Sequence, residues 1–444
     1  FPDLPLYRAD GSANDTMVAA YAAISGKTVN IADAYVAKGF DFTGTRQFDE
    51  RTGYRSQSFL TVPMRNHEGE IIGVLQLIIA RMPTHDVVVP FSEADQRLAE
   101  SLASQAAIAL TNRQLLRQLE VLFESFIQLI NSAIDDKSPY TGEHCQRVPE
   151  LTMMLAEAAH EATEGPLADF VLTDRDRYEL RIAALLHDCG KVTTPVHVVD
   201  KATKLQTIFD RIELIDTRFE VLRRDAEIRM LRQIAEGGPK EQAEAEFSQF
   251  VAKMEVDRDL LHKSNIGSER MNDADIERVR AIGATYRWHN GNGVEMDFLS
   301  ADELENLTIR AGTLTQGERE VINHHIEATI MMLEQLPWPK HLKNVPEYAG
   351  GHHERMDGKG YPRGLKREQM SWQARMMAIA DIFEALTAGN RPYKEAMTLS
   401  QALGILEKFR HNGHIDPDLH DVFINSEIYR KYAEAFLAVS QVDC

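Results

Sequence analysis

From Ser92 onward the chain contains no glycine or proline until Pro139, which predicts one long helix. Ser92 is followed three residues later by Asp95, the arrangement of a helix N-cap. A continuous helix from Ser92 to Asp135 would be about 65 Å long at about 1.5 Å per residue. We therefore expect three parts: a domain at 1–91, a linker helix at 92–137 and a second domain at 138–444.

One side of this helix is predicted to carry a heptad seam. Its members follow one another at alternating spacings of four and three: Leu98, Leu102, Gln105, Ala109, Asn112, Leu116, Leu119, Phe123, Phe126 and Ile130. The two polar members could fix the register of a parallel two-stranded coiled coil. We therefore expect a homodimer. The alternative is a single amphipathic helix that packs on its own domains.

Composition and charge narrow the class of protein. With 444 residues, 43% apolar and 26% charged, the chain is expected to be globular and too long for one core. Apolar stretches such as Val74 to Ala80 are too short for a membrane span, and no membrane partner is expected. Cys145, Cys189 and Cys444 show no paired spacing, which fits a reducing cytoplasm. A net charge of −19 argues against DNA binding over a broad surface.

The amino-terminal part alternates apolar and polar residues in the manner of strands. Residues 58–64 and 71–78 flank a polar turn at 66–70, which predicts a hairpin of a half-buried antiparallel sheet. The segments Val62-Pro63-Met64 and 73–77, with 26–33 upstream, resemble the pattern of GAF domains. The resemblance implies an α+β sensor domain at 1–91, incomplete or shortened at its start, whose ligand the sequence does not name.

The region at 203–308 differs in character from its flanks. Two helical apolar stripes, one running from Ile208 to Leu222 and one from Phe247 to Leu261, are separated by Gly237-Gly238-Pro239. This arrangement predicts a helical hairpin inserted into the second domain. Trp288-His289-Asn290 follows in a stretch that we expect to be irregular, with His289 as a surface or loop residue.

Four segments of the second domain bring candidate metal ligands. The apolar turn at 182–186 leads into His187 and Asp188; Gly190 would permit a close approach, and Lys191 lies one helical turn after His187. Adjacent His and Asp can serve two metal ions only if the carboxylate bridges them.

The other three segments supply imidazoles and one acid. A capping box at Thr315 and Glu318 starts a helix with His324 and His325, and periodicity does not decide which of the two points inward. His352 and His353 follow, and Asp381 interrupts an apolar helix face, where an unpaired charge would cost several kcal/mol. Each residue alone could be structural, but together they predict a site for borderline or hard divalent ions.

A glycine-rich loop with basic residues directly follows His353. It is the stretch 357–364, whose Lys359 and Arg363, together with Arg355 just before it, suit an anionic substrate. Gly360-Tyr361-Pro362 can be read as a tight turn with a packed aromatic or as part of the substrate site. The two interpretations are compatible.

These motifs together resemble the HD-GYP family of bacterial cyclic-dinucleotide phosphodiesterases over about 138–205 and 310–440. The resemblance rests on His187-Asp188 with Gly190-Lys191, the His of the capped helix, His352-His353-Glu354, residues 357–362, Asp381 and Arg391-Pro392-Tyr393-Lys394. It implies an all-α bundle holding two divalent ions, iron or manganese first, with nickel, magnesium and zinc as alternatives. It implies the ligands His187, Asp188, His325, His352, His353 and Asp381.

The resemblance also implies roles in catalysis. Asp188 would bridge the ions and help to activate a water, and Lys191 would hold a phosphate oxygen and assist the leaving group. Arg363 and Arg391 would neutralise phosphate charge, and Gly360 and Tyr361 would shape the substrate loop. The predicted reaction is hydrolysis of cyclic di-GMP or of the 3'3'-cyclic GMP-AMP hybrid to a linear dinucleotide, under control of the GAF-like domain.

Two departures from the family pattern limit what is carried over. His144 falls on a position that ligates a third ion in some members, but Tyr140 replaces their acidic residue one turn earlier, so His144 is expected to line the pocket without a third ion. The second departure is the insertion at 203–308. Two other functions stay open: a catalytically silent cyclic-dinucleotide sensor, and another HD-superfamily nucleotide phosphohydrolase. The sequence does not decide the base preference.

Overall fold

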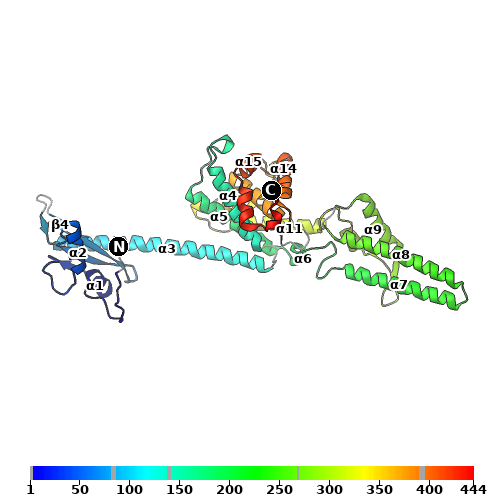
Figure 1. Cartoon of the computed structure of the whole chain (residues 1–444), viewed down its shortest axis with the longest axis horizontal. Helices are drawn as coiled ribbons and strands as arrows, with labels where there is room; N and C mark the ends of the chain where they lie inside the picture. Colours follow the sequence, from blue (N-terminus) through cyan, green and yellow to red (C-terminus); the bar gives the residue numbers. More distant parts are fainter. Residues whose placement is uncertain (1–3, 82–86, 138–141, 268–269, 390–395) are drawn as a thin grey trace. The chain divides into compact units, whose positions relative to one another are not determined.

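The structure, a computed structural model, describes residues 4–81, 87–137, 142–267, 270–389 and 396–444 (Figure 1). The chain folds into two compact units, Phe1–Ser125 and Phe126–Cys444. No helix within these described ranges is long and apolar enough to cross a membrane.

The first unit is a small antiparallel sheet with helices. Its elements are α1 (Val18–Ser25), β1 (Val29–Ile31), α2 (Thr43–Thr52), β2 (Phe59–Arg65), β3 (Ile71–Ile78), β4 (Ala80–Arg81), β5 (Val88–Val89) and the start of α3 (Glu93–Lys137). The main sheet has the order β1-β2-β3, and Leu60 of β2 pairs with Leu77 of β3. The hairpin predicted from the sequence is therefore present as β2 and β3.

Strand β2 is the centre of this unit because it is buried on both faces. Leu60, Val62 and Met64 pack against Ala99, Ala103 and Ala107 of α3. On the other face, Phe59 packs with apolar residues of the first half of the unit. The alternation of the two sets along β2 follows the period of two of a β-strand.

Helix α3 confirms the long helix predicted from the sequence. Ser92 and Asp95 form the expected reciprocal cap: the Ser92 backbone N–H donates to Asp95 Oδ2 over 2.8 Å, and the Asp95 N–H donates to Ser92 Oγ over 3.2 Å. The alanines that contact β2 recur every four residues and lie on one side of the helix. The predicted seam lies on another side and is largely exposed, as at Leu98 and Leu116, each 62% exposed.

The second unit is mainly helical. Its core elements are α4 (Gly142–His160), α5 (Asp174–Leu186), the 3-10 turn η2 (Cys189–Thr193), α6 (Val196–Val199), α11 (Gln316–Glu334), α12 (Val345–Gly350), α13 (Trp372–Thr387), α14 (Leu399–His411), α15 (Pro417–Asn425) and α16 (Ile428–Phe436). Further 3-10 turns span Gly165–Leu167, Lys340–Leu342, Arg367–Gln369 and Val439–Gln441. Helix α4 packs on α5 and α13, and α11 packs on η2 and α12.

The predicted insertion contains the expected helical hairpin and more. Its elements are α7 (Ile212–Ala235), α8 (Lys240–Asn265), α9 (Asp273–Thr285), β6 (Arg287–His289), β7 (Glu295–Asp297) and α10 (Ala301–Leu307). Helices α7 and α8 lie side by side (Figure 1) and share a core with Phe219, Met254 and Phe298. Two expectations were wrong: the stretch around His289 forms a strand and is not irregular, and Ile208, assigned to the apolar stripe, is 97% exposed. His289 itself is exposed, as expected of a surface residue.

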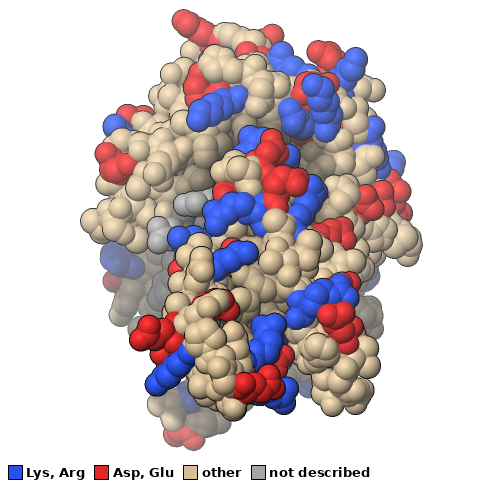
Figure 2. Space-filling model, turned by 90° about the vertical axis from the view of Figure 1, so that its right-hand side faces the viewer, with Lys and Arg blue, Asp and Glu red and all other residues tan. Residues whose placement is uncertain are grey.

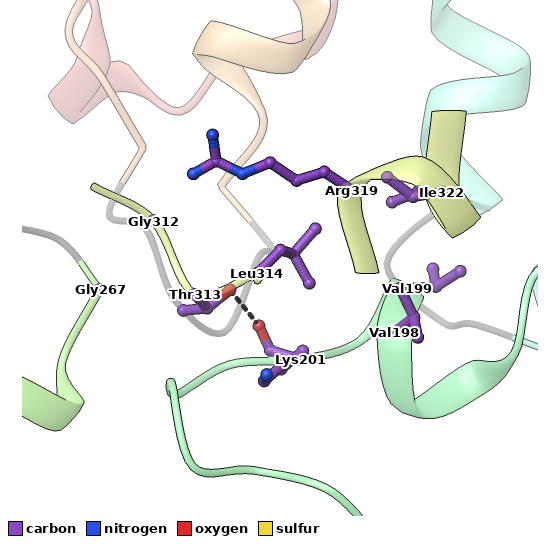
Figure 3. A pocket seen from close by; sticks show the side chains of 9 residues that line it. All are labelled: Val198, Val199, Lys201, Gly267, Gly312, Thr313, Leu314, Arg319 and Ile322. Carbon is purple, nitrogen blue, oxygen red and sulfur yellow. Dashed lines mark hydrogen bonds between the residues drawn. The ribbon is translucent and has the colours of Figure 1, made fainter. Parts of the chain in front are cut away.

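Two buried lysines form hydrogen bonds at the ends of the insertion, and one of them, Lys201, also contacts α11. The Nζ atom of Lys201 donates to Glu318 of the α11 cap over 2.7 Å and to Asn306 of α10 over 2.7 Å. Thr313 Oγ1 donates to the Lys201 carbonyl oxygen over 2.9 Å at the edge of a cavity of about 230 Å³ (Figure 3). The Nζ atom of Lys204 donates to the carbonyl oxygen of Ile309 over 2.7 Å.

Charge is finely mixed on the face of the molecule drawn in Figure 2. Lys and Arg side chains are interleaved there with Asp and Glu side chains, without one broad basic area.

Candidate metal centre

His187 and Asp188 lie at the junction of α5 and η2. Buried residues of the last turns of α5, including Ile182 and Leu186, hold this end of the helix inside the unit. The His187 side chain is fully buried, and its Nδ1 must donate to the carbonyl oxygen of Ala184, 2.7 Å away, because that oxygen can only accept. The other ring nitrogen, Nε2, lies 3.3 Å from Asp188 Oδ2.

Helix α11 brings His325 to the same place. Its predicted capping box between Thr315 and Glu318 is present. His325 is buried, its Nδ1 donates to the Ile322 carbonyl oxygen over 2.5 Å, and its Nε2 lies 3.3 Å from Asp188 Oδ1. His324 is exposed and contacts Glu327 at 2.7 Å. The structure thus separates the two histidines that periodicity could not.

His352 and His353 follow the end of α12. The Nδ1 atom of His352 donates to the Ala349 carbonyl oxygen over 2.6 Å, the third repetition of this local bond. The centroid of the His352 ring lies 4.9 Å from the centroid of the His187 ring and 4.3 Å from that of the His353 ring. In all three histidines the bond at Nδ1 fixes the tautomer that leaves a lone pair on Nε2 for a ligand.

Asp381 of α13 completes the set, which we call the His-Asp cluster and which consists of His187, Asp188, His325, His352, His353 and Asp381. The cluster borders His144 of α4, whose Nε2 lies 3.1 Å from Asp381 Oδ1 and 3.2 Å from Asp188 Oδ2. The other nitrogen of His144, Nδ1, lies 2.5 Å from Glu384 Oε2.

Several ligand atoms of the cluster are buried without a hydrogen-bond partner among the described residues. They are Asp188 Oδ1, His325 Nε2 and His352 Nε2. Buried polar atoms are rarely left unpaired, because each costs about 1–3 kcal/mol. Ligand atoms also gather within 4.8 Å of one another in three groups, namely His325-His352-His353, His187-Asp188-His352 and His144-His187-Asp381. The donors fit divalent cations.

The protonation states also suit metal binding. Burial lowers the pKa of His353 to about 4 and holds that of His352 well below its ordinary value, so both imidazoles are neutral at pH 7. Burial alone would raise the pKa of Asp188, but Lys191, His187 and His144 outweigh it and hold the pKa well below the usual range. The pKa of Asp381 is also low, against burial, chiefly because of His144. Neutral imidazoles and ionised carboxylates are the forms that bind metal ions.

Lys191 adds a positive charge at the edge of the cluster. Its Nζ atom donates to Asp188 Oδ2. Burial would lower the pKa of Lys191, but Asp188 and Asp381 outweigh burial and raise the pKa. The side chain therefore stays an ammonium group beside the predicted ligands.

The loop after His353 is folded tightly against the cluster. The Glu354 carboxylate is buried and accepts the backbone N–H groups of Arg363 and Leu365 over 2.7 and 2.8 Å. At Gly360 a Cβ atom would lie 2.4 Å from the backbone nitrogen of Arg355, so this close approach requires glycine. The Tyr361 ring stacks on the ring of His353 with centroids 4.9 Å apart.

Of the two arginines predicted to neutralise phosphate charge, the structure describes Arg363 alone, and it does not line the cavity beside the cluster. Arg363 lines a separate cavity and pairs with Glu334 at 3.1 Å. Arg391 lies outside the described residues. The cavity beside the cluster, of about 450 Å³, is instead lined by His353, Arg355, Lys359, Gly360, Tyr361, Asp381, Ile382, Ala385, Leu386 and His414.

Glu384 is a site residue that the sequence did not reveal. It is buried one turn after Asp381 on α13 and accepts from His144. The only signal in the sequence is that spacing of three, which places both acids on the same side of a helix.

Comparison with known families agrees with the two resemblances. A GAF domain family matches residues 6–110, an HD domain family matches residues 141–295, and a second HD domain family matches residues 298–419. The GAF match runs past residue 91 into α3, whose alanines pack on β2.

Individual relatives are similar over shorter stretches. The chain is 38% identical over 109 residues (24% of its length) to 3'3'-cGAMP-specific phosphodiesterase 3 of Vibrio cholerae, and 35% identical over 117 residues (26%) to a cyclic di-GMP phosphodiesterase of Pseudomonas aeruginosa. It is 31% identical over 132 residues (29%) to a cyclic di-GMP phosphodiesterase of Thermotoga maritima. The matches cover 23%, 27% and 35% of these relatives' own lengths.

Proposed function

Because the chain belongs to the HD domain proteins and carries a GAF domain ahead of its HD domain, we propose that it is a metal-dependent phosphodiesterase. Its substrate would be a cyclic dinucleotide, either cyclic di-GMP or the 3'3'-cyclic GMP-AMP hybrid, and its product the linear dinucleotide. The observation that carries the proposal is the buried His-Asp cluster, with its neutral imidazoles, ionised carboxylates and unpaired ligand atoms. The names of the relatives support the choice of substrate.

The six residues of the His-Asp cluster would hold two divalent ions, iron or manganese first, with nickel, magnesium or zinc as alternatives. When bound, such ions act as Lewis acids toward phosphate and water. Asp188 is suited to bridge them because its two oxygens face different partners. Oδ1 lies 3.3 Å from His325, and Oδ2 lies 3.2 Å from His144.

The remaining residues would bind and orient the phosphodiester. The Lys191 ammonium group, held in its charged form by Asp188 and Asp381, would contact a non-bridging phosphate oxygen and assist the leaving group. Tyr361 would fix the plane of His353 through their stacked rings. Lys359 lines the cavity and would add positive charge, beside the phosphate role predicted for Arg391, which lies outside the described residues.

The experiment is turnover of cyclic di-GMP, the hybrid and a chromogenic diester by the full chain with Mn²⁺ or Fe²⁺. We expect hydrolysis by the wild type and a loss of at least about a hundredfold in Asp188→Asn, which keeps the shape of the side chain. His324→Gln, next to a ligand but exposed, is the matched control and should retain activity.

The two other functions predict different results. Tight binding of a cyclic dinucleotide without any hydrolysis in the presence of each metal would favour the silent sensor. Hydrolysis of nucleoside triphosphates or alarmones in preference to the cyclic dinucleotides would favour the other HD-superfamily activity.

We also propose a homodimer through α3. The second half of this helix exposes a continuous set of apolar side chains, with Leu119 60% and Phe126 56% exposed. A second copy of the same helix would cover them in a coiled coil. We expect Leu116→Glu combined with Leu119→Glu to give a monomer in light scattering. Arg117→Ala, between them, should leave the dimer intact, and a wild type that is monomeric at micromolar concentration would refute the proposal.

Regulation by the GAF domain is supported by the end of α3. The Nζ atom of Lys137 donates to the backbone oxygens of Val192 and of Lys191, the latter over 3.4 Å. These carbonyl groups belong to η2, the turn that directly follows Asp188, so a movement of α3 would act on the site. Deleting residues 1–91 should therefore change turnover or its response to a GAF ligand. Unchanged behaviour would contradict this part of the proposal.

We assign the protein to the cytoplasm. This assignment is supported by Cys145, Cys189 and Cys444, all of which are free thiols.

A further inference from the structure

The cavity beside the His-Asp cluster extends beyond what the scissile phosphate needs. Its volume is about 450 Å³, and His353 and Asp381 line it at the cluster. A cyclic dinucleotide has two phosphates and two bases, and one phosphodiester can occupy the cluster at a time. The rest of the substrate must therefore meet other lining residues, which include His414 and the α13 side chains Ile382 and Leu386.

His414 is held rigidly in the loop between α14 and α15. Its backbone N–H donates to the Phe409 carbonyl oxygen over 2.9 Å, and its ring packs on the Phe409 ring with centroids 4.4 Å apart. The neighbouring Gly413 carbonyl oxygen accepts the backbone N–H of Asp357 over 2.9 Å, which ties this loop to the one that follows His353. The position of the imidazole is thus fixed relative to the cluster.

The imidazole of His414 is free to bind a ligand. No described residue forms a hydrogen bond with either of its ring nitrogens, although the side chain is half-buried. Burial, with Arg355 nearby, lowers the pKa of His414 against the opposing effect of Asp357, so the ring is neutral at pH 7. A neutral imidazole offers one donor and one acceptor.

This pairing of one donor with one acceptor matches a nucleobase edge better than a phosphate. Phosphate oxygens only accept, and they bind charged donors most strongly. Arg355, which could serve as such a donor, is already held by Asp357 through two bonds of 3.1 and 2.9 Å. Ile382 and Leu386 add apolar surface, which suits the face of a base.

We propose that His414, with the Ile382 and Leu386 side of α13, forms a nucleobase subsite for the half of the substrate that does not lie on the cluster. The inference rests on the proposed cyclic-dinucleotide activity and extends it. His414 binds the base edge, and the apolar side chains pack on the base.

The test compares two substitutions with different losses. His414→Phe keeps the packing on Phe409 but removes both hydrogen bonds to the ligand, whereas His414→Asn keeps a donor and an acceptor. The matched control is His411→Phe in the same segment, because His411 is exposed and pairs with Glu407 at 2.8 Å. The readout is kcat/KM for cyclic di-GMP and for the hybrid, each divided by kcat/KM for bis(p-nitrophenyl) phosphate, which has no nucleobase.

We expect His414→Phe to lower this ratio about fivefold to tenfold, the low end of the effect of losing two hydrogen bonds, mainly through KM. His414→Asn should restore part of the ratio, and His411→Phe should keep it. An unchanged ratio in His414→Phe overturns the subsite. Equal losses on the dinucleotides and the chromogenic diester overturn it as well, because they would place His414 in the support of the cluster or the fold.

Binding separates failure of the subsite from failure of the proposed reaction. If the wild type hydrolyses no cyclic dinucleotide, calorimetric titration of cyclic di-GMP into Asp188→Asn, with and without His414→Phe, decides the matter. Binding that His414→Phe weakens about fivefold or more supports the subsite even though the reaction is wrong. Binding that it leaves unchanged, or no binding at all, overturns the subsite.

Discussion

Gly190→Ala is the substitution whose cost follows most directly from the packing around the cluster. Gly190 lies in η2, two residues after Asp188, where η2 crosses α11. A methyl group there would lie 2.0 Å from the His325 carbonyl oxygen and 2.6 Å from the Thr329 backbone nitrogen. Both are helix backbone atoms that cannot rotate away, so η2 and α11 would have to separate.

The expected cost has three contributions. Overpacking of a tight contact costs about 1–3 kcal/mol. Loss of the bond from the Gly190 N–H to Thr329 Oγ1, now 2.9 Å long, costs about 1 kcal/mol. The alanine also lowers the conformational entropy of the unfolded chain, which stabilises the folded protein by about 0.4–1 kcal/mol. We therefore expect a net loss of about 1–3.5 kcal/mol. Metal binding should also weaken, because His325 moves away from Asp188.

The assay is urea unfolding followed by circular dichroism, with the thermal midpoint as a second measurement. The thermal midpoint should fall on the order of 5 °C. Gly317→Ala is the matched control, because Gly317 lies in the first turn of α11 and a methyl group there would meet nothing within 4 Å. It should leave stability unchanged or raise it by up to about 1 kcal/mol. If Gly190→Ala unfolds at the wild-type midpoint, the tight contact between η2 and α11 does not exist.

Three further predictions concern single side chains. Burial lowers the pKa of Lys204 to about 8, against about 10.4 in the unfolded chain. Between these two pH values the unfolded state therefore binds more protons than the folded state. The free energy of unfolding should rise with pH over this range, by on the order of 2–3 kcal/mol. Urea unfolding from pH 7 to pH 10 should show the rise in the wild type and not in Lys204→Met. Glu384→Gln should loosen His144, which contacts the predicted ligands Asp188 and Asp381, and so weaken metal binding about tenfold in a metal titration. An unchanged metal affinity would show that Glu384 does not support the cluster through His144. Lys191→Gln should lower kcat/KM about a hundredfold while bound metal, measured by mass spectrometry, stays constant; loss of the metal would instead make Lys191 a structural support of Asp188.

Local sequence signals predicted the elements whose causes are local. The caps at Ser92 and Thr315 and the absence of glycine and proline marked the starts of α3 and α11 and the length of α3. The strand alternation around Val62 likewise predicted β2 and β3.

Features that depend on distant partners were missed. Strands β6 and β7 have three residues each and exist through their pairing with one another, so the stretch around His289 was read as irregular. Glu384 reads as an ordinary helix residue, and its partner His144 is 240 positions away. Arg363 was predicted to neutralise phosphate charge, but the turn closed by Glu354 directs the loop so that Arg363 pairs with Glu334.

The choice between His324 and His325 depends partly on local signals and partly on a distant partner. Both sit on α11, and its apolar stripe is broad enough to admit either one. The family resemblance selected His325, and the structure places it in the cluster because Asp188 approaches α11 from η2, where Gly190 allows contact with the His325 backbone.

The fate of a cyclic dinucleotide in ¹⁸O-labelled water shows whether the His-Asp cluster is a hydrolytic centre. The full chain loaded with Mn²⁺ should convert cyclic di-GMP or the 3'3'-cyclic GMP-AMP hybrid to a linear dinucleotide that carries one labelled oxygen on its new terminal phosphate, as seen by mass spectrometry. Asp188→Asn should leave the cyclic compound intact. Recovery of both cyclic compounds unchanged from the wild type with Mn²⁺ and with Fe²⁺ would contradict the assignment of the His-Asp cluster as a hydrolytic centre.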